Sequence, residues 1–142
     1  MGRLLALDLG RKRCGVAVTD PLRICANGLP TVNTNEIITF LHDYFTKEQV
    51  DSIIIGEPKD LHGNPSDSMR YILPVINKIK KDFPEKPVIM YDERFTSAIA
   101  HQEMLTGGFK KKDRQQKERA DEMAAVLILT SYLESRQNNN EL

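Results

Sequence analysis

The chain has 142 residues, in which 20 lysines and arginines balance 20 aspartates and glutamates. This length fits one domain that buries roughly 70% of its unfolded surface, and the balanced charge leaves only the distribution of charge to indicate a partner. No apolar run approaches the 18 or so residues of a membrane span, and the N-terminus lacks a secretory pattern, so we expect a cytoplasmic protein without a membrane partner. Two cysteines are too few for a zinc site.

The first twenty residues predict a β-hairpin that carries a carboxylate beside a cluster of cations. Residues 3–8 have the pattern of a buried strand ending on Asp8, residues 10–13 of a turn, and residues 14–19 of a return strand. A carboxylate beside a core is costly to desolvate unless a cation pairs with it. The turn supplies Arg11, Lys12 and Arg13. Asp8 therefore predicts a metal or phosphate site; alternatively, it caps the turn.

The later segments predict strands joined by helices. Further strands are expected at residues 29–32, 52–56 and 87–91. Helices are expected after a cap at Thr34 or Asn35, at 66–81 with Pro74 as a kink or late start, from a cap at Thr96 or Ser97 to 106, and at 119–135. This order predicts one α/β domain over residues 1–136, with antiparallel leading hairpins, parallel later strands and a polar tail at 137–142 that frays.

Acidic residues fall at the predicted strand ends and at the start of the last helix. They are Asp8, Glu57, Asp92, Glu93 and Asp121. Asp121 alone is explained by the helix dipole, which contributes roughly 0.3–1 kcal/mol. Carboxylates converging on one sheet edge would repel each other without a cation, and oxygen ligands without His or Cys indicate Mg²⁺ or Mn²⁺. Such ions can activate water for phosphodiester hydrolysis.

Four motifs together resemble one family. They are the hairpin Asp8-Leu-Gly-Arg-Lys-Arg-Cys-Gly-Val-Ala-Val-Thr-Asp20, Ile55-Gly-Glu-Pro58 with Gly63, Asp92-Glu-Arg-Phe-Thr-Ser97, and Ala120-Asp-Glu-Met-Ala-Ala125. Over residues 3–135 the chain is similar to the YqgF-like family of the RNase H-like superfamily, whose members are described as Holliday junction resolvases and as pre-16S ribosomal RNA nucleases. The resemblance implies an RNase H-like fold with a mixed five-stranded sheet flanked by helices.

The resemblance also implies the roles of the acidic residues. By it, Asp8, Glu93 and Asp121 are the catalytic carboxylates that bind the metal. Glu57 departs from the family, in which this position is commonly apolar. It is either a fourth ligand, as in the related resolvase branch, or a solvated loop residue, and the second interpretation is slightly favoured.

Basic residues near these carboxylates predict contacts with nucleic acid. The candidates are Arg11, Lys12, Arg13, Arg94, Thr96, Lys110, Lys111, Lys112 and Arg114. Arg94 and Thr96 would hold a phosphate at a helix N-terminus, although Arg94 can instead pair with Asp92 or Glu93. The run from Lys110 onward would track a phosphate backbone from a mobile loop, although such runs are usually solvated.

These observations favour a metal-dependent nuclease. On family grounds the expected activity is 5′-end processing of pre-16S rRNA on ribosomal precursor particles, with resolution of branched DNA junctions as the alternative. A non-catalytic nucleic-acid-binding module is the second alternative. An ATPase of the actin and Hsp70 type shares the hairpin but needs two such domains. An RNA-processing enzyme has no need of a dimer, whereas a resolvase needs two-fold symmetry, so we expect a monomer or weak homodimer.

Overall fold

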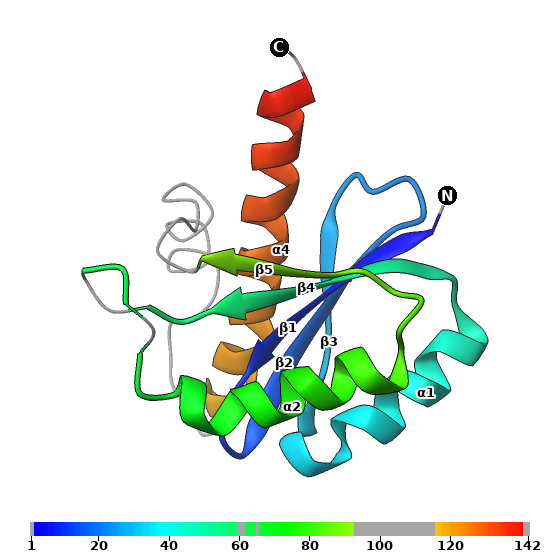
Figure 1. The fold of residues 1–142 in the computed structure, drawn as a ribbon. Helices are drawn as coiled ribbons and strands as arrows, with labels where there is room; N and C mark the ends of the chain where they lie inside the picture. Colours follow the sequence, from blue (N-terminus) through cyan, green and yellow to red (C-terminus); the bar gives the residue numbers. More distant parts are fainter. Residues whose placement is uncertain (1, 60–61, 65, 93–115, 141–142) are drawn as a thin grey trace.

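A computed structural model of the chain describes residues 2–59, 62–64, 66–92 and 116–140, apart from the side chains of 116–121 and 137–140 (Figure 1). The elements in chain order are β1 (Arg3–Leu9), β2 (Arg13–Thr19), β3 (Ala26–Asn33), the 3-10 turn η1 (Thr34–Glu36), α1 (Ile37–Lys47), β4 (Val50–Glu57), α2 (Met69–Asp82), β5 (Val88–Asp92) and α4 (Gln116–Asn140). Within the described part of the chain, no helix is long and apolar enough to cross a membrane.

The five strands form one mixed sheet in the order β3-β2-β1-β4-β5. β1 pairs antiparallel with β2, and β2 pairs antiparallel with β3. β1, β4 and β5 run parallel to one another, so their carboxyl ends share one edge of the sheet. The predicted arrangement of antiparallel leading hairpins and parallel later strands is confirmed.

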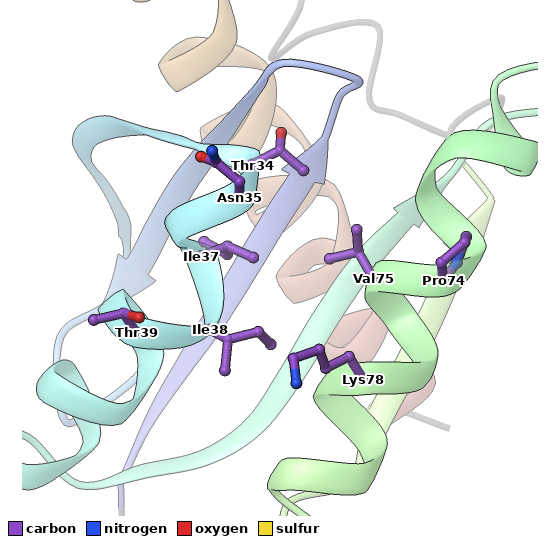
Figure 2. Close-up of a pocket in the computed structure, with 8 residues that line it drawn as sticks. All are labelled: Thr34, Asn35, Ile37, Ile38, Thr39, Pro74, Val75 and Lys78. Carbon is purple, nitrogen blue, oxygen red and sulfur yellow. The ribbon is translucent and has the colours of Figure 1, made fainter.

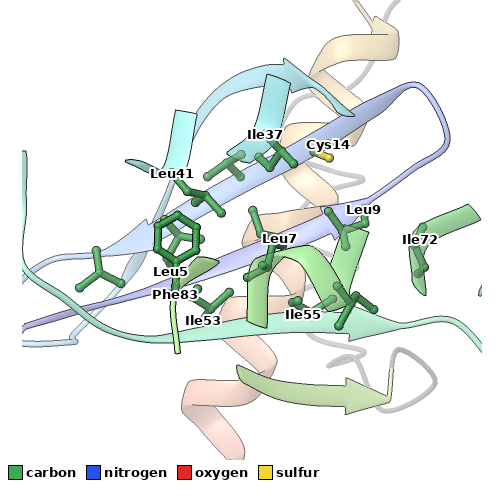
Figure 3. Packing of buried hydrophobic residues seen from close by; sticks show 14 of the residues in the cluster. Leu5, Leu7, Leu9, Cys14, Ile37, Leu41, Ile53, Ile55, Ile72 and Phe83 are labelled. Carbon is green, nitrogen blue, oxygen red and sulfur yellow. The ribbon is translucent and has the colours of Figure 1, made fainter. Parts of the chain in front are cut away.

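Each face of the sheet has its own hydrophobic core. α1 and α2 cover one face, and α4 crosses the other (Figure 1). Leu5 and Leu7 of β1 belong to the first core, together with Ile53 and Ile55 of β4 (Figure 3). The alternate residues of β1 and β4 pack with α4 in the second core: Leu4, Ala6 and Ile54. Successive side chains of a strand point to opposite faces, so this alternation shows which face each strand end presents.

The helices differ from their predicted bounds. Thr34 does not cap a helix; its hydroxyl donates to the carbonyl of Gly10 at 2.8 Å, and its amide donates to the carbonyl of Lys12 at 2.9 Å. These bonds attach η1 to the β1–β2 turn. They engage the Thr34 hydroxyl, which is the group that a helix cap would need. α2 begins at residue 69, later than predicted, and continues through Pro74. α4 begins three residues before the predicted 119–135 and continues five past it, so 137–140 are helical.

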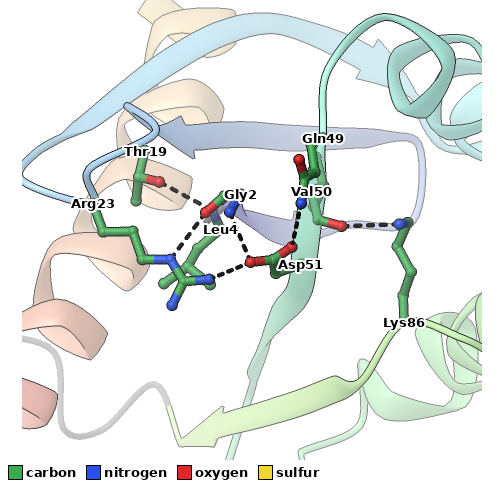
Figure 4. A network of polar contacts seen from close by, with 8 residues as sticks. All are labelled: Gly2, Leu4, Thr19, Arg23, Gln49, Val50, Asp51 and Lys86. Carbon is green, nitrogen blue, oxygen red and sulfur yellow. Dashed lines mark hydrogen bonds and ion pairs between the residues drawn. The ribbon is translucent and has the colours of Figure 1, made fainter.

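A polar network fixes the amino end of β1, at the far end of the strand from Asp8 (Figure 4). Oδ2 of Asp51 accepts the amide of Gly2 at 2.8 Å and Nη2 of Arg23 at 2.7 Å. Arg23 also donates from Nε to the carbonyl of Gly2 at 3.0 Å, and its backbone has a φ of 59°, which a non-glycine residue rarely adopts. The network ties the β2–β3 connection to β1 and β4, and thereby holds the parallel strands in register.

Candidate active site

Asp8 lies between two glycines on the face of the sheet that α4 covers. Leu4 and Ala6 of β1 pack on this face, and side chains two residues apart in a strand point the same way, so Asp8 faces α4 as well. Asp8 pairs with Gly15 of β2, and because Leu7 pairs with Ile55, the next residue of β4, Gly56, is the neighbour of Asp8 on its other side. Asp8 is half-buried, and both of its neighbours on the adjacent strands are glycines.

Tyr91 extends this row on the next strand. It pairs with Gly56 and packs with the core beneath α4, where its ring meets that of Tyr132 at a centroid distance of 6.1 Å. Burial raises the pKa of the Tyr91 phenol, and the carboxylates of Glu134 and Asp92 act in the same direction. The phenol therefore keeps its proton at neutral pH. Glu93 lies outside the described residues.

α4 packs across β1, β2 and β3. Ala125 is fully buried in the core that contains Ala6, the residue of β1 two before Asp8. Position 121 precedes Ala125 by four residues, about one helical turn. Glu122 lies against β3, where a Cβ added at Gly28 would come within 2.5 Å of Cγ of Glu122.

Glu57 and Asp92 occupy the opposite face. Glu57 is the last residue of β4, not a loop residue, and alternation from Ile55 puts it on the face covered by α1 and α2. Asp92 pairs with Glu57 in the β4–β5 register. Nζ of Lys59 is 3.8 Å from Oε1 of Glu57. The structure therefore separates these two carboxylates from Asp8, and it corrects the placement of Glu57 in a loop, which overlooked that β4 extends one residue past Gly56.

The residues that the structure describes contain no group of three metal-binding side chains. Of the three predicted ligands, Asp8 is described in full, Asp121 by its backbone, and Glu93 falls outside the described residues. The donor set is consistent with a hard divalent cation, because it offers carboxylate oxygen without thiol or imidazole.

Of the three predicted cations of the β1–β2 turn, two are exposed to solvent and one is the first residue of a strand. Arg11 and Lys12 are exposed, and Arg13 is the half-buried first residue of β2. Cζ of Arg11 lies 4.8 Å from the ring centroid of Tyr71. The remaining predicted contacts lie outside the described residues: Arg94, Thr96, Lys110, Lys111, Lys112 and Arg114.

Tyr71 is a surface residue that the sequence analysis missed. The buried stripe of α2 contains Ile72, Ile76 and Ile79, and a tyrosine one position before this stripe leaves it exposed. An aromatic residue on the polar side of an amphipathic helix was the available signal. Arg70, next to it, approaches the same ring at 5.9 Å.

The sheet order and the helices on both faces define the class of protein. The structure titled "T. thermophilus RuvC in complex with Holliday junction substrate" has a TM-score of 0.59 with this chain at 14% identity, covering 96% of both chains. The structure titled "Crystal structure of Fowlpox virus resolvase and substrate Holliday junction DNA complex" has the same TM-score at 15% identity, covering 94% of this chain and 97% of that one. The chain therefore has an RNase H-like fold.

Residues 2–135 match the RuvX family, described as Holliday junction resolvase, and the chain belongs to this family. A protein of Phocaeicola vulgatus is 53% identical over 137 residues, which cover 96% of this chain and 99% of that protein. A protein of Bacteroides thetaiotaomicron is 51% identical with the same coverage. Both carry the name "Putative pre-16S rRNA nuclease". The family resemblance found in the sequence is confirmed.

Proposed function

We propose that this protein is a metal-dependent nuclease that processes the 5′ end of pre-16S rRNA in the cytoplasm, on ribosomal precursor particles. The position of Asp8 carries this proposal: it is a carboxylate at the carboxyl end of a central strand, set between Gly15 and Gly56 on the face covered by α4. Ligands bind at this edge of open α/β sheets. The names of the relatives that are about half identical favour RNA as the substrate.

Asp8, Glu93 and Asp121 would hold the divalent cation, Mg²⁺ or Mn²⁺. When bound, such an ion lowers the pKa of a water and stabilises the leaving oxygen of a phosphodiester. Asp8 contributes a carboxylate from the rigid centre of the sheet, which fixes its position. Asp121 belongs to an early turn of α4, and Glu93 comes directly after β5 in the sequence. These relations support a common site for the three residues.

The cations of the β1–β2 turn would position the substrate beside Asp8. Arg11 and Lys12 are exposed two and three residues past the end of β1, where they can contact phosphates. Arg94 and Thr96 would hold a further phosphate, and Lys110, Lys111, Lys112 and Arg114 would follow the backbone. Glu57, on the opposite face, would be outside the metal site. Phosphate contacts of this kind position a substrate without reading its sequence.

Resolution of Holliday junctions is the second candidate function, favoured by the family description and by the DNA complexes of the fold relatives. Resolution requires two active sites related by a two-fold axis, whereas RNA processing can be carried out by a monomer.

Purified protein incubated with a precursor 16S transcript and, in parallel, with a four-way DNA junction tests the proposal. We expect cleavage of the transcript in Mg²⁺ or Mn²⁺, none after chelation, and none by Asp8→Asn. Preferential cleavage of the junction, together with a dimer in solution, would support the second candidate. Absence of metal-dependent cleavage of either substrate would instead favour a non-catalytic binding module.

A further inference from the structure

Tyr71 presents an aromatic ring to solvent beside the β1–β2 turn. Its side chain is 43% exposed, while Ile72, the next residue of α2, is fully buried. The guanidinium carbon of Arg11 lies 4.8 Å from the ring centroid, and that of Arg70 lies 5.9 Å from it, which is near the outer limit of a cation–π contact. An exposed ring contributes little to the stability of the hydrophobic core. The ring of Tyr71 is therefore placed where a binding partner could contact it.

A pocket of about 530 Å³ lies beside the β1–β2 turn and is lined in part by Arg11, the residue that contacts Tyr71; Tyr71 itself is not among the lining residues. Its lining comes from the β1–β2 turn, from η1 and from α2: Arg11, Lys12, Asn33, Thr34, Asn35 and Val75. Two of these side chains are cations, three are uncharged polar residues, and none of the described lining residues is acidic. The pocket therefore favours an anion with hydrogen-bonding groups.

A second pocket, of about 500 Å³, continues from the first between α1 and α2 (Figure 2). The two pockets share the lining residues Thr34, Asn35 and Val75 and are therefore adjacent, and together they are called the trough. Figure 2 shows Val75 and Lys78 of α2 facing α1 across the second pocket. Tyr71, Val75 and Lys78 are spaced four and three residues apart on one side of α2, and the seven-residue step from the first to the last spans about 10 Å.

Building on the proposed function, we propose that this trough binds a single-stranded segment of the RNA substrate. An unpaired base stacks on Tyr71, and phosphates contact Arg11, Lys12 and Lys78. Stacking needs no particular base, because every base has an aromatic face. Arg70, which approaches the ring more distantly than Arg11, is the group that the base displaces. In duplex RNA the bases are already paired and stacked, so the ring selects single strands.

The trough and Asp8 lie on opposite faces of the sheet, and the β1–β2 turn lies between them. The trough lies on the side of the sheet that α1 and α2 cover, whereas Asp8 faces α4. A strand that passes over Arg11 and Lys12 at this turn reaches both. The inference thus specifies the substrate: an RNA that carries an unpaired segment next to the bond that is cut.

Binding without cleavage tests the inference. Fluorescence anisotropy with a short single-stranded RNA, and with a blunt duplex of the same sequence, is measured in chelator. We expect Tyr71→Ala to weaken single-strand binding by about tenfold and to leave duplex binding unchanged, and Tyr71→Phe to restore it. Leu73→Ala, at a residue of the same helix that is 47% exposed, is the matched control and should bind as the wild type does.

Charge in the trough is tested by the salt dependence of the same binding. Lys78→Ala should flatten the slope of log affinity against log salt by about 0.7 for a single strand, whereas Lys80→Ala, an exposed residue of α2 that does not line the trough, should leave it unchanged. Melting temperatures verify that the variants are folded.

Three results would overturn the inference: single-strand binding by Tyr71→Ala equal to that of the wild type, equal losses on single strand and duplex, or wild-type protein that binds no single strand. Cleavage of precursor RNA is scored separately. A wild type that cuts, with Tyr71→Ala binding normally, refutes the trough alone; a wild type that binds single strands through Tyr71 but never cuts refutes the proposed function alone.

Discussion

Glu57 and Asp92 lie opposite each other where the parallel strands β4 and β5 end, on the face of the sheet away from Asp8. Lys59 lies 3.8 Å from the Glu57 carboxylate. This pairing gives Glu57 a partner that is independent of any metal.

Glu57→Gln should therefore have a smaller effect on cleavage than Glu93→Gln. Removing a residue that supports a metal ligand typically lowers activity about 10–100-fold. Removing the ligand itself should lower activity further. We expect Glu93→Gln to lose more than about 100-fold and Glu57→Gln less than about tenfold, in initial rates on precursor RNA. Equal losses at the two positions would indicate a site of four carboxylates, as in the resolvase branch.

Asp8→Asn and Asp121→Asn should each abolish cleavage and leave the fold intact or slightly stabilised. Several carboxylates around one site repel each other when no cation is bound, so removal of one charge relieves this repulsion. Millimolar Mg²⁺ should raise the melting temperature of the wild type but not of the variants, because an ion that binds only the folded state stabilises it. A wild type that gains no stability from Mg²⁺ or Mn²⁺, or variants that still cut, would refute the metal site.

Gly56→Ala should lower activity without unfolding the protein. Gly56 is the neighbour of Asp8 on β4, and a methyl group there would occupy the space beside the carboxylate. A shift of about 1 Å in a catalytic group can cost about 100-fold in rate. A strand interior gains roughly 0.5–1 kcal/mol from replacing glycine by alanine, which offsets some of the crowding. Unchanged cleavage, with the same metal-dependent rise in melting temperature as the wild type, would show that the space is not used.

The sequence allowed prediction of the mixed sheet and the family, but not of every element. The continuous apolar run in β1 and the run of isoleucines in β4 are local signals, and the structure contains both strands. The bonds of Thr34 to the β1–β2 turn join residues 22 to 24 apart, and a cap signal at Thr34 could not reveal that partner. The sequence did not show that β4 continues to Glu57. Because successive side chains of a strand point to opposite faces, the face of Glu57 could be assigned only once it was known to belong to the strand.

Asp51→Asn should destabilise the protein at neutral pH and have a decreasing effect in acid. The Gly2 amide, together with Gln49 and Arg23, holds the pKa of the Asp51 carboxyl below its ordinary value of 3.8, against the opposing effect of burial. A carboxyl with a depressed pKa in the folded state stabilises it above the unfolded pKa, and this contribution is lost as the pH falls through the folded pKa.

Melting temperatures of wild type and Asp51→Asn between neutral pH and about pH 3 measure this effect. The two curves should converge as the pH falls. Asp43→Asn is the control: Asp43 forms an exposed pair with Lys47 on α1, and such pairs contribute about 0.3–0.5 kcal/mol. A gap between wild type and Asp51→Asn that stayed constant with pH would show that the carboxylate charge is not what stabilises this network.

Replacement of Lys110, Lys111, Lys112 and Arg114 by alanine should weaken nucleic-acid binding through charge alone. These residues lie outside the described part of the chain and precede α4, which begins at Gln116. Up to four phosphate contacts would be lost, so the slope of log affinity against log salt should flatten by up to about 3–4 units. Exposed charges contribute under about 0.5 kcal/mol each to stability, so the melting temperature should change little. A slope unchanged for both a structured RNA and a branched DNA would show that the segment is only a solvated loop.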